Sequence, residues 1–133
     1  MDVYEGGCLC GAVRFRARAP ATKACFCHCR SCRRASGAPV VAWATFAAAG
    51  VRITRGTLRE HRSSEKVTRG FCGACGTGIT YVHDATPDEI DLALATLDDP
   101  SAIPPESHIW VSHRLQWMTP GDGLPQYAEW RTG

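Results

Sequence analysis

The sequence predicts a mainly β protein in which helices are limited to short turns. Short runs rich in β-branched and aromatic residues recur along the chain. Several of these runs alternate apolar and polar side chains with the two-residue period of a strand buried on one face. Glycines and prolines bound the runs at short intervals, as turns between strands require.

The strand-like runs can be followed in chain order. The clearest is 12–18 (AVRFRAR), in which three apolar residues alternate with three arginines. Further strands are expected at 40–46 (VVAWATF), 50–56 (GVRITRG), 56–62 (GTLREHR), 65–71 (EKVTRGF) and 78–83 (GITYVH). The run 89–97 (EIDLALATL) is expected to be a strand, with a helix as the alternative. A short helical turn is expected at 30–37 (RSCRRASG), ended by Gly37 before Pro39.

Length and composition limit the possible functions. A chain of 133 residues with 44% hydrophobic residues is most simply one domain, 1–133, with its own core. A formal net charge of +2 does not indicate a nucleic-acid surface. The most apolar stretch, 39–51, is too short to span a membrane, and the acidic, glycine-broken opening is not a secretory signal. We therefore expect a soluble, cytoplasmic protein, in which clustered cysteines are metal ligands or redox groups rather than disulfides.

The eight cysteines fall into three groups, and the two outer groups predict one metal site. In CGACG, Cys72 and Cys75 stand three apart in a glycine-rich turn, the spacing of a zinc knuckle. A structural zinc needs four ligands, and CLCG offers Cys8 and Cys10, which would project to the same face of a strand. The prediction is a structural zinc on these four cysteines. The alternative is a pair of redox-active dithiols without metal.

The middle group, CFCHCRSC at 25–32, leaves three alternatives open. Cys25, Cys27 and Cys29 alternate along an extended run, and Cys32 follows one turn later. Four thiolates could close a second structural site, three could hold zinc with an open coordination position, or the group could be a redox cluster. Because consecutive extended ligands are hard to wrap around a tetrahedral ion, three thiolates plus an external ligand is the favoured interpretation.

Four motifs carry a resemblance to a known family. GGCLCGAVRF, CHCRSCRRASGAPVVAWATF, RGFCGACGTGITY and HIWVSHRLQWM resemble, in order and spacing, the glutathione-dependent formaldehyde-activating enzyme family, whose domain also occurs in centromere protein V. The resemblance implies a β-tent fold of layered antiparallel sheets around two zinc ions per chain. It assigns the structural zinc to the outer cysteines and the second zinc to Cys27, Cys29 and Cys32. Cys25 lies outside the family's pattern and could be a core residue, a spare ligand or a redox partner.

The resemblance also implies an activity. The family is named for the condensation of glutathione with formaldehyde to S-hydroxymethylglutathione, which makes this chain a candidate carbon–sulfur lyase. Cys27, Cys29 and Cys32 would act through zinc by holding the glutathione sulfur as a thiolate beside the aldehyde. A proton donor must neutralise the alkoxide that forms, and His28 and His108 are the nearest candidates in the sequence. For both histidines a structural role, through a hydrogen bond in the interior, is the favoured interpretation.

Other residues near these motifs have two interpretations each. Arg30 and Arg33, with Arg34, could bind the carboxylates of glutathione, or could offset the charge of the thiolates and face solvent. Three tryptophans are expected in the core, one of them as a candidate cleft wall: Trp43, Trp110 and Trp117. The irregular segment 119–130 is a candidate lid.

Three functional alternatives remain at this point. They are the same zinc chemistry on another thiol or aldehyde, a non-catalytic zinc scaffold, and a thiol or metal redox sensor. The expected partners of the favoured enzyme are glutathione and an aldehyde, with neither nucleic acid nor membrane. Exposed edge strands make a homodimer a further expectation.

Overall fold

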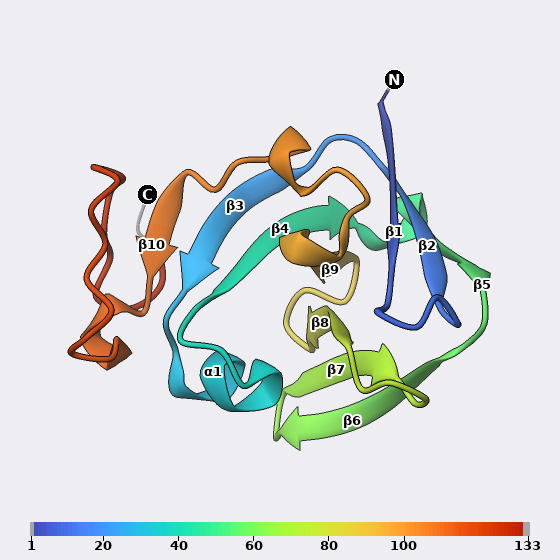
Figure 1. The fold of residues 1–133 in the computed structure, drawn as a ribbon, viewed down its shortest axis with the longest axis horizontal. Coiled ribbons are helices and arrows are strands. Elements are labelled where there is room, and N and C mark those ends of the chain that lie inside the picture. The colour runs from blue at the N-terminus through green and yellow to red at the C-terminus, as the bar shows by residue number, and fades with distance from the viewer. Residues whose placement is uncertain (1, 132–133) are drawn as a thin grey trace.

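The computed structural model describes residues 2–131, which form two β-sheets and short helices (Figure 1). The smaller sheet has the order β1-β2-β5 and the larger one the order β10-β3-β4-β9-β8-β7-β6. All neighbours in these sheets are antiparallel except β10 and β3, which are parallel. The strands are β1 (Val3–Gly7), β2 (Arg14–Arg18), β3 (Thr22–Cys27), β4 (Val41–Ala47), β5 (Val51–Arg55), β6 (Leu58–Ser64), β7 (Val67–Cys72), β8 (Gly78–His83), β9 (Glu89–Ala93) and β10 (Ser107–Ile109). The predicted mainly β fold of layered antiparallel sheets is confirmed.

The helical elements are short. They are the α-helix α1 (Arg30–Ser36) and the 3-10 turns η1 (Ala48–Gly50), η2 (Leu94–Thr96), η3 (Pro100–Ala102) and η4 (Val111–His113). No helix in the described part of the chain is long and apolar enough to cross a membrane.

Most strands predicted from alternation are present, but the run 89–97 is only partly a strand. β9 ends at Ala93, and the chain then turns through η2. This turn leads the chain away from the larger sheet toward β1, where Leu97 pairs with Gly6 and the Asp98 amide donates to the Glu5 carbonyl. The strand prediction beyond residue 93 is therefore wrong, because this tertiary pairing takes over from local alternation.

The predicted helical turn is confirmed as α1, and both of its ends have a local cause. The sulfur of Cys29 caps the start, accepting a hydrogen bond from the Cys32 amide at 3.2 Å. Gly37 ends the helix with φ +65°, a left-handed conformation that glycine adopts without strain. Its amide donates to the Arg33 carbonyl at 2.8 Å.

The main core lies between the two sheets. Phe15 of β2 and Phe46 of β4 are each 1% exposed and belong to one buried cluster with Leu92 of β9. Gly6 in β1 allows η2 to approach closely, because a Cβ atom there would lie 2.4 Å from the Thr96 carbonyl oxygen. A second, smaller cluster contains Cys25, Cys27, Cys32, Trp43, Ala93 and Ile109. Near α1 the interior is thus built around cysteines as well as hydrocarbon side chains.

Candidate functional site

The outer cysteines meet in one cluster. Cys72 ends β7, and Cys75 lies in the turn before β8. Their sulfurs and those of Cys8 and Cys10 all lie within 4.8 Å of one another. The Cys10 sulfur is 3.7 Å from that of Cys8 and 3.8 Å from that of Cys72. The cluster joins the N-terminal hairpin to a turn more than sixty residues later.

The local geometry at Cys8 and Cys10 differs from the expected strand. β1 ends at Gly7, and the chain turns, with the Gly11 amide donating to the Cys8 carbonyl at 3.2 Å. The prediction that both cysteines project from one strand face is therefore wrong. A turn, made possible by the left-handed φ of +79° at Gly11, brings the two sulfurs together instead.

Hydrogen-bond donors point at these sulfurs, as is expected around thiolates that bind a metal. The Val13 amide donates to the Cys8 sulfur at 3.2 Å, and the Cys75 amide to the Cys72 sulfur at 3.5 Å. Hydrogen bonds from the Thr77 hydroxyl and amide lower the pKa of Cys75 to about 5, which favours the thiolate. Four sulfurs at this spacing, with amides directed at them, fit a tetrahedral thiolate-bound ion such as zinc.

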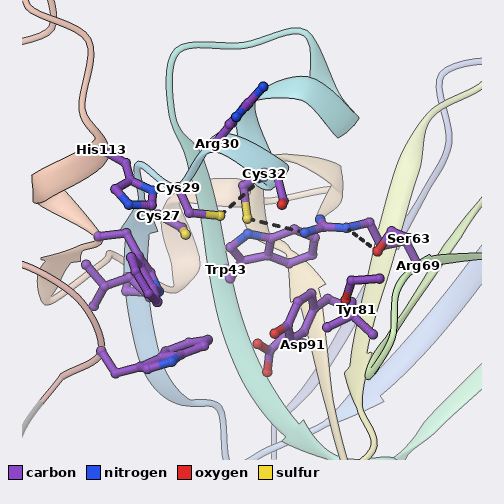
Figure 2. A pocket seen from close by; sticks show the side chains of 17 residues that line it. Cys27, Cys29, Arg30, Cys32, Trp43, Ser63, Arg69, Tyr81, Asp91 and His113 are labelled. Carbon is purple, nitrogen blue, oxygen red and sulfur yellow. Dashed lines mark hydrogen bonds between the residues drawn. The ribbon is translucent and has the colours of Figure 1, made fainter.

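The middle group forms a second, three-sulfur cluster (Figure 2). Cys27 ends β3, Cys29 caps α1, and Cys32 lies in its first turn, with the three sulfurs within 4.8 Å of one another. Hydrogen bonds from the Cys27 and Cys32 thiols and the Cys32 amide lower the pKa of Cys29. The donor set fits a thiophilic ion held by three protein ligands.

Cys25 does not belong to this cluster. It lies two residues before Cys27 on β3, is 5% exposed, and contributes to the wall of a cavity. Burial raises its pKa to about 12, so it is a neutral thiol near neutral pH. This placement corresponds to a buried wall residue rather than to a fourth member of the cluster.

A cavity of about 360 Å³ opens directly on the three sulfurs. Its polar lining includes Arg30, Ser63, Arg69, Asp91 and His113 (Figure 2). Its apolar lining includes Trp43, Val67, Tyr81, Ile109, Trp110 and Trp130. The three-sulfur cluster therefore faces a space large enough for a small molecule.

Arg69 is a cavity residue that the sequence analysis missed. Its guanidinium lies 3.8 Å from the Cys32 sulfur, donates to the Ser63 hydroxyl at 3.2 Å, and stands 5.2 Å above the Tyr81 ring (Figure 2). The available signal was its position between Val67 and Phe71, where a charge interrupts the apolar face of an expected strand.

Asp91 is the second missed residue. It stands directly opposite Tyr81 in the β8–β9 pair, and both line the cavity. The Thr45 hydroxyl donates to its carboxylate at 2.7 Å. Burial raises the pKa of Asp91 to about 6 and that of Tyr81 to about 12. Asp91 can therefore exist in both protonation states near neutral pH.

The arginines predicted to bind substrate carboxylates lie in different places. Arg30 lines the cavity, whereas Arg33 donates to the His28 carbonyl at 3.4 Å. Neither Arg33 nor Arg34 is among the described residues that line the cavity.

The two candidate histidines lie outside the cavity lining and bond to each other. His28 is fully buried, with its Nε2 2.9 Å from Nδ1 of His108. Nε2 of His108 lies 2.8 Å from the Asp122 carboxylate. This geometry corresponds to the structural role favoured from the sequence, while His113, which was not singled out, lines the cavity.

The tryptophans and the C-terminal segment also differ in part from expectation. Trp43 is 8% exposed, but Trp117 is 73% exposed, so its predicted place in the core is wrong. Trp117 lies in a turn after η4 and is exposed there. The segment 119–130 runs beside β10, where the Tyr127 amide donates to the His108 carbonyl at 2.9 Å (Figure 1). Its residue Trp130 forms part of the cavity wall.

Comparisons with known proteins agree with the motifs. The family model "Glutathione-dependent formaldehyde-activating enzyme" matches residues 3–113. An uncharacterized lyase of Schizosaccharomyces pombe is 31% identical over 83 residues, which are 62% of this chain and 60% of that protein. A Halomonas elongata protein, provisionally named a glutathione-dependent formaldehyde-activating enzyme, is 26% identical over 87% of this chain and 80% of its own.

A solved structure shares the fold. The crystal structure of a Rhodobacter sphaeroides protein matches with a TM-score of 0.61 at 23% identity, covering 92% of this chain and 98% of the other. Together with the match over most of the chain, the motifs lead to one conclusion: the chain belongs to the glutathione-dependent formaldehyde-activating enzyme family.

Proposed function

We propose that the protein is a zinc-dependent carbon–sulfur lyase that forms and cleaves the adduct between glutathione and an aldehyde. Membership of the family and a lyase-named relative support a formaldehyde-activating or lyase role in general. The observation that carries the specific proposal is the cavity of about 360 Å³ that opens on Cys27, Cys29 and Cys32. A non-catalytic scaffold needs no such space beside its metal ligands.

The proposal assigns two zinc ions. Cys8, Cys10, Cys72 and Cys75 would hold one that stabilises the fold, because all four positions of a tetrahedral ion are then filled. Cys27, Cys29 and Cys32 would hold the other, which would stabilise a substrate sulfur in its nucleophilic thiolate form. Clustered free thiols persist in a reducing compartment, which supports a cytoplasmic location.

The cavity residues have separate roles in this proposal. Arg69 offsets the negative charge of the three thiolates, and Arg30 lies at the cavity as a partner for a substrate carboxylate. Substrate sulfur and carbonyl carbon are held together by the cavity walls, which favours bond formation through proximity.

Asp91 is proposed to move the proton. When the carbon–sulfur bond forms, the carbonyl π electrons move to oxygen, and that oxygen takes up one proton. When the adduct breaks, the hydroxyl gives the proton back and the sulfur leaves as thiolate. A cavity carboxyl group with a pKa of about 6 can do both near neutral pH. His28 and His108 do not line the cavity, so the proposal gives them no proton to transfer.

Exchange NMR on an equilibrated mixture of glutathione, formaldehyde and their adduct tests this function. Because the components combine unaided, the quantity to compare is the interconversion rate with and without protein. We expect the zinc-loaded protein to accelerate exchange and Cys29→Ser to abolish the acceleration. Cys25→Ser is the matched control, since it alters the same cavity outside the cluster and is expected to keep its metal. Exchange at the background rate with the loaded protein would overturn the proposal.

A further inference from the structure

The cavity beside the three sulfurs is walled by two aromatic pairs from different parts of the fold. Trp43 of β4 and Tyr81 of β8 have ring centroids 5.9 Å apart. Trp110, which follows β10, and Trp130 in the C-terminal segment form an edge-to-face pair with centroids 5.6 Å apart. All four residues line the same cavity. Figure 2 shows Trp43 near the cysteine sulfurs and Tyr81 next to Asp91.

Folding alone does not account for the second pair. Trp110 has φ +57° and ψ +35°, a left-handed conformation that bulky residues rarely adopt and that tends to occur at functional sites. Hydrogen bonds on either side hold it there, from the Trp110 amide to Glu129 and from the Val111 amide to Tyr127. Trp130 remains 55% exposed although it lies on the cavity wall. Trp110 also packs against the smaller buried cluster, whereas Trp130 belongs to neither cluster and borders the cavity without being part of the core.

Formaldehyde gives these walls little to contact. Its adduct adds only a hydroxymethyl group to the sulfur, whereas the cavity measures about 360 Å³. Aromatic walls bind by apolar contact and by ring stacking, and both require a group of comparable size.

A second cavity leaves the aromatic one free for such a group. It measures about 440 Å³ and shares with the first the residues Cys25, Tyr81, Asp91, Ile109 and Trp130. The rest of its lining is polar or charged and includes Lys23 and Arg131. Lys23 is paired with Glu89 of the same lining at 3.4 Å. Arg131 is therefore the cation that suits one carboxylate of a thiol such as glutathione, with Arg30 for the other. The polar part of the thiol and the substituent of the aldehyde therefore have separate places.

From this division we infer that the aldehyde half of the substrate carries an aryl or similarly flat, apolar group, which packs against Trp110 and Trp130 beside the three sulfurs. The inference rests on the proposed lyase function and specifies its substrate class. Trp130 is the wall residue to replace in a test of this preference, because its side chain is 55% exposed and its loss should disturb folding little.

Binding of two stable thioethers tests the inference without turnover. S-benzylglutathione carries the aryl group, and S-methylglutathione is the matched analogue without it. Titration calorimetry on the zinc-loaded protein should show S-benzylglutathione binding about tenfold more tightly or better. Trp130→Ala should reduce this ratio several-fold. Trp117→Ala, which removes an exposed tryptophan outside the cavity lining, should leave the ratio unchanged.

Equal affinities for the two thioethers would overturn the inference, as would equal effects of Trp130→Ala and Trp117→Ala on the ratio. Exchange NMR separates this failure from that of the lyase function. Acceleration of formaldehyde exchange together with equal thioether affinities removes only the aryl preference. Background exchange with both formaldehyde and benzaldehyde removes the proposed function itself.

Discussion

The guanidinium of Arg69 lies 3.8 Å from the sulfur of Cys32 and is fixed from two other directions, by the Ser63 hydroxyl and the Tyr81 ring. Three thiolates around a divalent ion leave a net negative charge. A guanidinium at this position favours the thiolate form of the cluster without occupying a metal ligand position.

Replacing this arginine should weaken one metal site and spare the other. We expect Arg69→Met to lower the metal affinity of the three-cysteine site about three- to tenfold, because a partly exposed charge interaction contributes about 1 kcal/mol. Stepwise competition with a chelator would measure the metal affinity of both sites, and the four-cysteine site serves as the internal reference. Arg59→Met is the control. The Arg59 guanidinium lies 6.0 Å from the centroid of the Phe71 ring, and Arg59 is not among the described residues that line the cavity. Identical affinities in Arg69→Met and wild type would contradict this role.

The buried carboxyl of Asp91 predicts a pH-dependent stability difference. Its pKa is raised from 3.8 to about 6 by burial, so the charged form is disfavoured in the folded state. The resulting destabilisation is absent below about pH 4, grows as pH rises through this window, and is complete above about pH 7. Asp91→Asn keeps an acceptor for Thr45 and should be more stable than wild type by roughly 1–3 kcal/mol at pH 7.

Urea unfolding of both proteins from pH 4 to pH 8 would measure this difference. The gap in unfolding free energy should widen with pH, while the exchange activity of Asp91→Asn falls at every pH. A gap that stays constant with pH would show that Asp91 has an ordinary pKa.

Metal removal should destabilise the fold through the four-cysteine cluster. Cys10 is exposed, so Cys10→Ser loses a ligand and little packing. We expect this variant to lose several kcal/mol of stability in the metal-loaded state, because structural zinc contributes its binding energy to folding. With excess chelator, the wild type and the variant should unfold together. Thermal unfolding with and without chelator measures the stability difference between the two proteins. If Cys10→Ser remains less stable than wild type in chelator, lost packing rather than lost metal causes the difference.

Replacing one of the two buried histidines should lower the free energy of unfolding without reducing the bound metal. His108→Phe keeps the stacking on Phe26, at 4.8 Å, but leaves Nε2 of His28 without its partner. A buried polar group without its partner is expected to cost about 1–3 kcal/mol. Urea unfolding, metal content and thiol exchange should be measured together. Reduced exchange at unchanged stability would instead give the histidines a part in the chemistry.

Local sequence patterns predicted those features that depend on neighbouring residues. Alternation identified β2 and β4 to β8, and Gly37 identified the end of α1. Cysteine spacing identified the groups whose sulfurs the fold brings together. β3 and β10 were not among the predicted strands, since β3 ends in the cysteine run and β10 has only three residues, held by parallel pairing with β3. The N-terminal strand was expected to carry Cys8 and Cys10, but β1 ends at Gly7.

The cavity depends on contacts between distant segments and could not be predicted in the same way. Arg69 and Asp91 lie in strands separated by β8, and both line the cavity, although only Arg69 reaches toward a cysteine sulfur (Figure 2). Tryptophan content likewise did not distinguish Trp130, on the cavity wall, from the exposed Trp117.

X-ray absorption at the zinc edge, before and after glutathione is added, would show whether the three-cysteine site takes up a substrate sulfur. We expect one added sulfur neighbour at about 2.3 Å at this site, which is half a sulfur per zinc averaged over the two sites, in the wild type and in Cys25→Ser alike. An unchanged sulfur count under saturating glutathione, or loss of one sulfur in Cys25→Ser before glutathione is added, would contradict this expectation, the second result by making Cys25 the fourth ligand of a closed site.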